Sequence, residues 1–442
     1  MKIYLVGGAV RDELLGYPAL DQDWLVVGAT PEQLLALGYQ AVGKDFPVFL
    51  HPKTKQEYAL ARTERKQGQG YTGFACYFAQ DVTLEQDLQR RDLTINAIAM
   101  DQDGKLYDPY GGQTDLENKT LRHVSEAFAE DPLRVLRVAR FAARYSSYGF
   151  QIAPETMQLM QTMAESGELD ALTPERVWKE TSRALLEDHA DVYFQTLRDC
   201  GALKHLFPEI DALFGIPQRP EYHPEVDCGI HTLMSLQQAC KSNYSLDVRF
   251  AVLVHDLGKA LTPANELPRH IMHEERGVKP VTELCERLKV PTQTRQLALS
   301  VCKEHLKCHQ IMSLKPGTVW RLLQRLDVLR RPERVEAFVQ ACECDAKGRL
   351  GLEDRPYPQA QYMLNAMQIV RSIKVQDLPE NIKGAEIGEM LIQYRIDALT
   401  EFKHQHGLVG DFKPHARKNH ILAVDDIDHQ GLEKVQRLRL RP

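Results

Sequence analysis

The spacing of apolar and polar residues changes once along the chain, near residue 127. Before this point, short apolar runs predict strands at Lys2–Val6, Trp24–Val27, Val48–His51 and Glu57–Ala61. After it, apolar residues recur at intervals of three and four, as at Leu133 and Leu136, which is typical of amphipathic helices. We therefore expect an α+β fold, in which a small α/β region is followed by an almost wholly helical remainder.

Proline-bearing breaks divide the helical part into segments, at Pro208, at Pro217–Pro224 and at Pro356–Pro358. A chain of 442 residues also exceeds what one hydrophobic core usually supports. We predict four domains, namely a head at 1–125, a helical neck at 126–215, a helical body at 225–335 and a helical tail at 336–442. The C-terminal end of the tail is a candidate for disorder.

Composition and charge exclude some classes of protein. Hydrophobic residues make up 43% and charged residues 26%, and charges interrupt the longest apolar stretches, so we expect no membrane span. The apolar N-terminus runs into Arg11 without a cleavage-like segment, and the nine cysteines form no CxxC pair, which together favour a cytoplasmic protein. The net charge of -6 gives no overall sign of nucleic-acid binding, so such binding would depend on local basic patches. The candidates are Lys119–Arg144 and the residues after Lys413, and the alternative for each is an ordinary solvated helix face.

Two short motifs near the N-terminus suit a nucleotide and a metal ion. A diglycine turn at Gly7–Asp12 joins the first strand to a helix, where free backbone N–H groups favour phosphate, although no Walker motif follows. Asp21 and Asp23 alternate on the next strand, so their carboxylates lie side by side, and a divalent cation relieves their repulsion. Oxygen ligands favour Mg²⁺. Each motif alone is compatible with a surface turn.

The two motifs resemble those of the nucleotidyltransferase superfamily, and three further segments narrow the resemblance to its class II branch. These segments are Arg90–Ala97, Glu130–Arg134 with Arg137 and Arg140, and Glu175–Glu180. This branch contains CCA-adding tRNA nucleotidyltransferases and bacterial poly(A) polymerases. Beyond Glu180 the chain continues to resemble the bacterial multifunctional CCA-adding type, which carries an HD phosphohydrolase domain. The resemblance implies a nucleotidyltransferase head, a neck, an HD body and a tail that binds tRNA.

The resemblance also implies roles for individual residues. The reaction would transfer nucleotides from CTP and ATP to the 3′ end of tRNA, with Asp21 and Asp23 as catalytic magnesium ligands and Glu57 as a third catalytic carboxylate. The implied nucleotide-binding residues are Gly8, Arg11, Arg91, Asp92, Asp131, Arg134, Arg137 and Arg140. A glycine-rich loop at Glu64–Phe74 matches the flexible loop that such enzymes need for changing from C to A addition, with a passive linker as the alternative.

Asp131 and Arg134 have a chemical reason to select bases. Three positions apart on a predicted helix, they would share a face and present a carboxylate acceptor beside a guanidinium donor. Cytosine and adenine each offer an amino donor beside a ring-nitrogen acceptor, whereas uracil and guanine offer a carbonyl beside a ring N–H. Such a pair accepts C and A without a nucleic-acid template. We expect Glu175, Arg176 and Glu180 to brace it from a neighbouring helix; an ordinary surface ion pair is the alternative.

A histidine cluster marks the body, because seven of the sixteen histidines lie between His223 and His309. His231, the adjacent pair His255 and Asp256, and Asp345 resemble the ligand signature of HD phosphohydrolases. Mixed imidazole and carboxylate ligands favour a transition metal such as Ni²⁺, Mn²⁺ or Co²⁺. His273 and His305 are candidates for a second metal, or else structural histidines. The resemblance implies 2′,3′-cyclic phosphodiesterase, 2′-nucleotidase and phosphatase activities.

Two other functions compete with tRNA CCA addition and repair. A bacterial poly(A) polymerase shares the head motifs, but the intact His255–Asp256 pair counts against it. A nucleotide-sensing regulator with a degenerate head would have lost a carboxylate, and Asp21 and Asp23 are both present. We expect tRNA, CTP and ATP as partners and no membrane, with a monomer and a homodimer both open.

Overall fold

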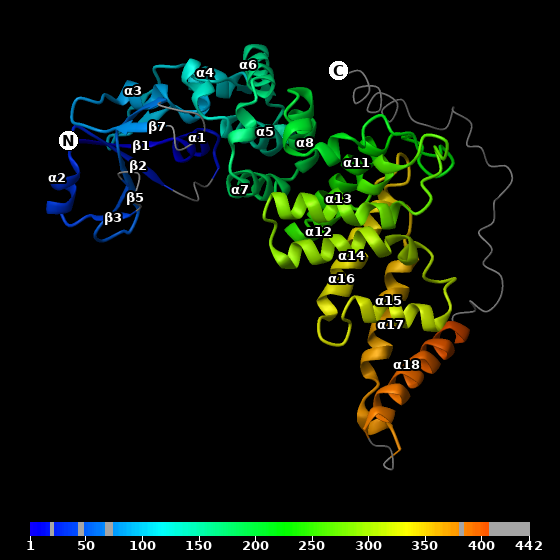
Figure 1. The fold of residues 1–442 in the computed structure, drawn as a ribbon. Helices are drawn as coiled ribbons and strands as arrows, with labels where there is room; N and C mark the ends of the chain where they lie inside the picture. Colours follow the sequence, from blue (N-terminus) through cyan, green and yellow to red (C-terminus); the bar gives the residue numbers. More distant parts are fainter. Residues whose placement is uncertain (18–21, 43–47, 67–73, 380–383, 406–442) are drawn as a thin grey trace. The chain divides into compact units, whose positions relative to one another are not determined.

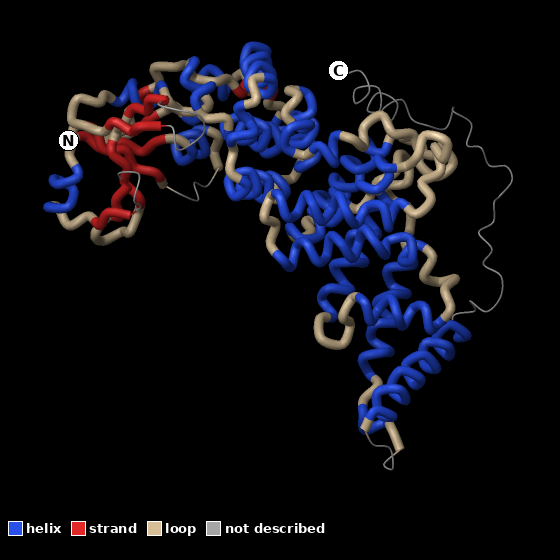
Figure 2. Tube along the Cα trace, in the orientation of Figure 1, coloured by secondary structure: helices blue, strands red, loops and turns tan. Residues whose placement is uncertain are grey.

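The computed structural model describes residues 1–17, 22–42, 48–66, 74–379 and 384–405, so the expected disorder at the C-terminal end concerns residues outside the described part. The chain divides into two compact units, one of Met1–Ala184 with Val192–Leu206, the other of Leu185–Asp191 with the chain from Phe207 onward. The strands belong to the first unit, and the second is helical (Figure 2). Among the described residues, no helix has the length and apolar character needed to cross a membrane.

A seven-stranded sheet, in the order β3-β4-β5-β2-β1-β8-β9, forms the head (Figure 1). Its strands are β1 (Lys2–Val6), β2 (Asp23–Val27), β3 (Gln40–Val42), β4 (Val48–Leu50), β5 (Glu57–Leu60), β8 (Ala99–Met100) and β9 (Leu106–Tyr107). Strand β2 is antiparallel to β1 and parallel to β5. The four predicted strands correspond to β1, β2, β4 and β5, and the predicted α+β class is confirmed.

Both faces of the central strands are covered, which explains the unbroken apolar run of β2. On one face Leu25 packs with Tyr4 and with Leu88 of α3 (Leu84–Gln89). On the other face Val26 packs with Leu34 of α2 (Pro31–Ala36). A strand buried on both faces loses the alternation of a half-exposed strand.

Short helices and strand pairs complete the first unit. The helices are α1 (Gly8–Leu14), α4 (Gly112–Glu117), α5 (Leu133–Tyr145), α6 (Pro154–Glu165), α7 (Pro174–Leu185), α8 (Ala190–Asp199) and α9 (Leu203–Leu206). The strand pairs are β6 (Thr63–Lys66) with β7 (Phe74–Tyr77), and β10 (Thr120–Leu121) with β11 (Gln151–Ile152). The ends of the predicted glycine-rich loop are therefore strands, and its centre, 67–73, lies outside the described residues.

The second unit is a succession of helices. They are α10 (Pro208–Asp211), α11 (Cys228–Lys241), α12 (Leu246–Val254), α13 (His273–Arg287), α14 (Thr292–His309), α15 (Pro316–Arg325), α16 (Pro332–Lys347), α17 (Pro358–Ser372) and α18 (Ala385–Gln405). Pro208 and Pro358 begin helices because the first helical position needs no N–H donor, so these predicted seams are helix starts. Helix α12 packs against α11, α14 and α16 (Figure 1). The predicted boundary between body and tail falls inside α16.

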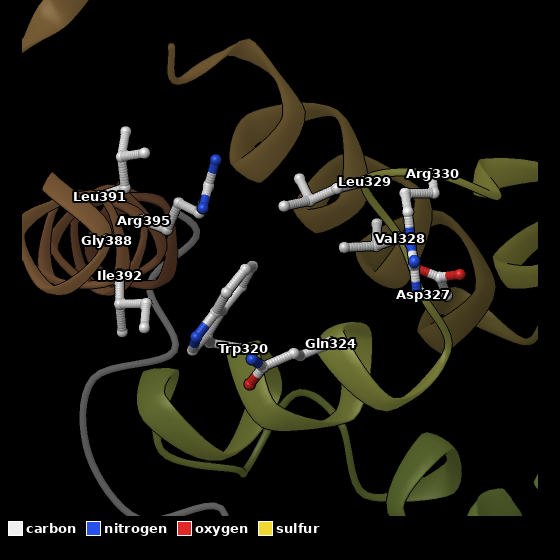
Figure 3. Close-up of a pocket in the computed structure, with 10 residues that line it drawn as sticks. All are labelled: Trp320, Gln324, Asp327, Val328, Leu329, Arg330, Gly388, Leu391, Ile392 and Arg395. Carbon is white, nitrogen blue, oxygen red and sulfur yellow. The ribbon is translucent and has the colours of Figure 1, made fainter. Parts of the chain in front are cut away.

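An open pocket of about 310 Å³ lies between α15 and α18 (Figure 3). Its buried Arg395 lies 5.2 Å from the ring centroid of Trp320. The same guanidinium donates to the carbonyl oxygens of Val370 and Ile373, at 3.1 and 3.4 Å. Because these carbonyls end α17, Arg395 serves as a helix cap.

Candidate active sites

The strand register brings two of the predicted head carboxylates to one edge of the sheet. Asp23 pairs with Val6, the last residue before the diglycine turn. Strands β2 and β5 are parallel, and Trp24 lies opposite Tyr58. Asp23 and Glu57, one position earlier on each strand, therefore lie side by side. Both residues are exposed, and Asp21 lies outside the described residues.

The diglycine turn has the backbone that its sequence predicts. Gly7 has a φ of 68°, a left-handed conformation that favours glycine, and α1 begins at Gly8. A Cβ atom on Gly7 would lie 2.9 Å from Nη1 of Arg91. The turn therefore needs glycine both for its backbone angle and for the close approach of this arginine.

A chain of polar contacts joins the turn to α5. Arg11 donates to Asp12 at 2.9 Å and to the Asn96 side chain at 2.5 Å. Asn96 donates to Asp92 at 2.9 Å, and Nε of Arg137 donates to the same carboxylate at 2.7 Å. Burial alone would raise the pKa of Asp92, but Arg137 and these hydrogen bonds outweigh it and hold the pKa well below its usual range.

Two supporting residues were missed in the sequence. Asn96 lies inside a recognised segment but had no assigned role. Asp87, which is fully buried, accepts from the backbone N–H of Arg62 and from the guanidinium groups of Arg90 and Arg91. The spacing of three and four residues between Asp87 and the two arginines was the available signal.

The base-selecting pair differs from its prediction. Asp131 has extended backbone and precedes α5, whereas Arg134 lies in the first turn of that helix. The prediction that the two share a helix face is wrong, because Pro132 disfavours helical backbone in the residue before it. The Asp131 carboxylate binds Arg176 at 2.9 Å and the N–H of Leu133 at 3.1 Å.

The buried Arg134 guanidinium donates to two backbone carbonyls, those of Ala127 and Arg90, each at 2.5 Å. The bracing helix is α7, because Arg176 reaches Asp131 and Glu180 accepts from Arg140 at 2.8 Å. Both Arg140 and Glu180 are buried. The head and neck thus hold Arg134 and Arg140 rigidly through partners on other elements.

In the second unit, the structure brings together the four predicted HD ligands. Nε2 of His231 lies 3.0 Å from Oδ1 of Asp345, and Nε2 of His255 lies 3.2 Å from Oδ2 of Asp256. Asp345 comes from α16 and His231 from α11. Helix α12 ends at Val254, so His255 and Asp256 lie directly after the end of this helix.

His273 and His305 lie in the same cluster. Their Nε2 atoms are 3.2 Å apart, and Nε2 of His273 lies 3.2 Å from Oδ1 of Asp256. His231, His255 and Asp345 therefore form one group with metal-binding geometry, and Asp256, His273 and His305 form another; His231 also belongs to a third, with His223 and Glu225. All six side chains are buried.

The donor set fits divalent metal ions. Within the described part of the chain, Nε2 of His255 and both carboxylate oxygens of Asp256 are buried without a well-aligned hydrogen bond. Burial alone would lower the pKa of His255, but Asp256 and Asp345 outweigh it and raise the pKa to about 10. Buried carboxylate oxygens without well-aligned hydrogen bonds, together with inward-facing imidazole nitrogens, suit a bound cation.

Three neighbours of the centre were not predicted as site residues. Nζ of Lys259 lies 2.6 Å from Asp256 and donates to Gln218 at the same distance. Nε2 of His309, on α14, lies 2.7 Å from Oδ2 of Asp345. Glu225 contacts His231. Only spatial proximity identifies these residues, because each is distant in sequence from at least one partner.

Three stretches of the chain match known protein families, and most of the chain has close relatives. Residues 3–122 match the family described as Poly A polymerase head domain, 149–214 match Probable RNA and SrmB- binding site of polymerase A, and 229–347 match HD domain. A Multifunctional CCA protein of Acinetobacter baumannii strain AYE is 87% identical over 406 residues, covering 92% of this chain and 98% of the relative. One from Vibrio campbellii is 58% identical over 400 residues, covering 90% and 98%.

The fold has a solved counterpart, the Thermotoga maritima CCA-adding enzyme complexed with tRNA. It is 20% identical with a TM-score of 0.58, and the match covers 99% of this chain and 91% of that one. At this identity the likeness concerns the fold. The close relatives and the motif geometry lead to one conclusion: the chain belongs to the multifunctional CCA protein family and is a nucleotidyltransferase whose head is followed by an HD domain.

Proposed function

We propose that the first unit adds and repairs the 3′-terminal CCA of tRNA in the cytoplasm, using CTP and ATP without a nucleic-acid template. The observation that carries the proposal is the strand register, which sets Asp23 beside Glu57 and next to the diglycine turn. The names of the relatives and the tRNA complex of the Thermotoga maritima enzyme support tRNA as the substrate.

The chemistry follows from these positions. Asp21 and Asp23 would hold Mg²⁺, which when bound steadies the triphosphate and the departing pyrophosphate, and Glu57 would be a third catalytic carboxylate beside them. The 3′-hydroxyl gives up its proton to a head carboxylate or to water, and its oxygen forms a bond to the α-phosphorus. The bond from this phosphorus to the oxygen that bridges to the β-phosphorus breaks, and pyrophosphate leaves. Gly8, Arg11 and Arg91 lie by the turn and suit the triphosphate, and Asp92 suits a ribose hydroxyl.

Asp131 and Arg134 would read the base through a carboxylate acceptor and a guanidinium donor. Arg176 holds the Asp131 carboxylate, and two backbone carbonyls hold the Arg134 guanidinium. The two groups can therefore be fixed in place without sharing a helix face. Arg137 and Arg140, which follow on α5, are anchored to Asp92 and Glu180. Side chains that are held in place by such partners suit the selection of bases by the protein itself, without a nucleic-acid template.

Replacing Asp23 tests the transferase proposal. We expect Asp23→Asn to reduce addition of CMP and AMP to a tRNA that lacks CCA by about 100-fold or more, because a metal ligand is lost. Gel analysis of the tRNA, incubated with each nucleotide alone and with all together, measures the addition. Asp103→Asn, which makes the same change at an exposed carboxylate of the same unit, is the matched control. Addition of CCA at the parental rate by Asp23→Asn would contradict the proposal, and a long A tail would favour poly(A) polymerase.

We further propose that the second unit is a transition-metal phosphohydrolase with 2′,3′-cyclic phosphodiesterase, 2′-nucleotidase and phosphatase activity. The inward Nε2 atoms of His231 and His255, with the carboxylate of Asp345, support one ion site, and His273 and His305, with the carboxylate of Asp256, support a second. Bound Ni²⁺, Mn²⁺ or Co²⁺ would supply an activated water near neutral pH. These activities would trim damaged tRNA ends before CCA is rebuilt.

Replacing His255 tests this second activity. We expect His255→Ala to lose hydrolysis of a 2′,3′-cyclic phosphate while keeping CCA addition, because it removes a ligand of one unit only. His404→Ala, an exposed histidine of α18, is the matched control. Chelation followed by reloading with each metal identifies the active ion. Metal-dependent hydrolysis retained by both His255→Ala and Asp256→Asn would show that the cluster is structural.

A further inference from the structure

Glu225 occupies an unusual position behind the histidine cluster. Its side chain is fully buried, and Oε1 lies 3.0 Å from Nδ1 of His231 and 3.0 Å from Nδ1 of His223. The other oxygen accepts from the N–H of Leu350 at 3.3 Å. The carbonyl oxygen of Gly348 also lies 3.1 Å from Nδ1 of His231. Two acceptors therefore fix the proton on Nδ1 and leave Nε2 free for an ion.

The other histidines of the centre have neutral partners at the corresponding atom. Nδ1 of His255 meets the carbonyl of Val252 at 2.7 Å, and Nδ1 of His273 meets that of His270 at 2.8 Å. Nδ1 of His305 meets that of Val301 at 2.9 Å. The Glu274 carboxylate lies 3.7 Å from Nδ1 of His273, beyond hydrogen-bond distance. Among these four histidines of the described structure, His231 is thus distinguished by a carboxylate within hydrogen-bond distance of Nδ1, at 3.0 Å.

This difference has a chemical consequence. A carboxylate that accepts from the outer nitrogen of a metal-bound histidine orients the ring and makes its inner nitrogen a stronger ligand, an effect worth about 10- to 100-fold in metal affinity. A backbone carbonyl orients the ring without adding a negative charge. The group that contains His231 should therefore bind an ion more tightly than the group that contains His273 and His305.

We propose that Glu225 is a positioning residue that makes the two ion sites unequal, so that the site at His231, His255 and Asp345 fills before the site at Asp256, His273 and His305. The inference rests on the proposed metal-dependent function of the second unit. His223 has a supporting part, because its ring shares Oε1 of Glu225 and thereby helps to stabilise a buried carboxylate.

Calorimetric titration of the full chain with Co²⁺, with Mg²⁺ present to occupy the head carboxylates, tests the proposal, and the absorption of bound Co²⁺ follows the same titration. We expect the parent to bind in two steps. Glu225→Gln keeps the shape and a hydrogen-bond acceptor but removes the charge, so the tight step should weaken about 10- to 100-fold while the second step and the stoichiometry stay unchanged. Glu209→Gln, whose carboxylate pairs with Arg287, is the matched control.

The outcomes separate this inference from the proposal beneath it. A parent that binds no Co²⁺ would overturn the metal-dependent function itself. A parent that binds in two steps, with Glu225→Gln giving the same curve, would overturn the role of Glu225 alone. If Glu225 were itself a ligand together with His223, then His223→Gln would remove one equivalent of bound Co²⁺; we expect the stoichiometry of this variant to stay unchanged.

Discussion

At the scale of single residues, the head and neck pair charged side chains that are buried or half-buried. Arg137 pairs with Asp92, Arg140 with Glu180, and Arg11 with Asp12. Removing one partner of a buried ion pair leaves an uncompensated charge, which is more damaging than the loss of an exposed pair. The same contacts that fix the proposed nucleotide-binding groups should therefore also stabilise the first unit.

Asp92 gives a pH-dependent prediction. Since its pKa is lowered in the folded chain, its ionised carboxylate contributes stability above the unfolded pKa of about 3.9. This contribution is lost as the pH falls toward the folded pKa, where the folded and unfolded forms are both protonated. We therefore expect Asp92→Asn to lower the free energy of unfolding of the first unit most above about pH 5, and less as the pH falls toward 3.

Urea unfolding of the parent and the variant at several pH values measures this difference. Asp103→Asn, which changes an exposed carboxylate of the same unit, should show a small difference that varies little with pH. A destabilisation by Asp92→Asn that grows toward pH 3 would contradict the prediction.

At the scale of elements, the sequence predicts those features that depend on local pattern. Apolar runs located four strands of the head, since burial on both faces leaves a continuous signal, but β8 and β9 have two residues each and leave almost none. The metal ligands came from motif spacing and resemblance. Asp131 was misplaced because the restriction imposed by Pro132 was overlooked, and Glu225 was missed because its partner is defined by tertiary contact.

One element-scale contact has a measurable consequence. Gly258 follows the His255–Asp256 pair, and a Cβ atom there would overlap the carbonyl oxygen of His273 and lie 2.5 Å from the backbone N of Gly277. Gly258→Ala must push α13 away from the pair, which should destabilise the second unit by about 1–3 kcal/mol and reduce phosphohydrolase activity, with CCA addition retained.

Gly388→Ala is the matched control for this substitution. Gly388 lies inside α18 with nothing within 4 Å of its would-be Cβ atom, so alanine there should stabilise the helix by about 0.5–1 kcal/mol. Urea unfolding of both variants measures the two effects. Equal stability of Gly258→Ala and the parent would mean that α13 is not tightly held against the metal-binding pair.

At the scale of the whole molecule, the two proposed activities belong to two compact units with separate cores. The transferase carboxylates lie on the head sheet, and the histidine cluster draws its ligands from α11, α14 and α16 and from the ends of α12 and α13. A ligand that binds one folded unit stabilises that unit by mass action and has no direct effect on the other.

Calorimetry of the metal-free chain should therefore show two unfolding transitions, of which Co²⁺ raises only one. At a free ion concentration about 100 times the dissociation constant, the stabilisation should be about 2.7 kcal/mol. The transition that moves should be the one that Gly258→Ala lowers, since this substitution acts beside the metal ligands of the second unit. His255→Ala, which removes a ligand of one of the two ion sites, should reduce the shift, and His404→Ala should keep it in full. A single transition that Co²⁺ raises as a whole would mean that the units unfold together, and the separation of the two activities would then have no basis in their stability.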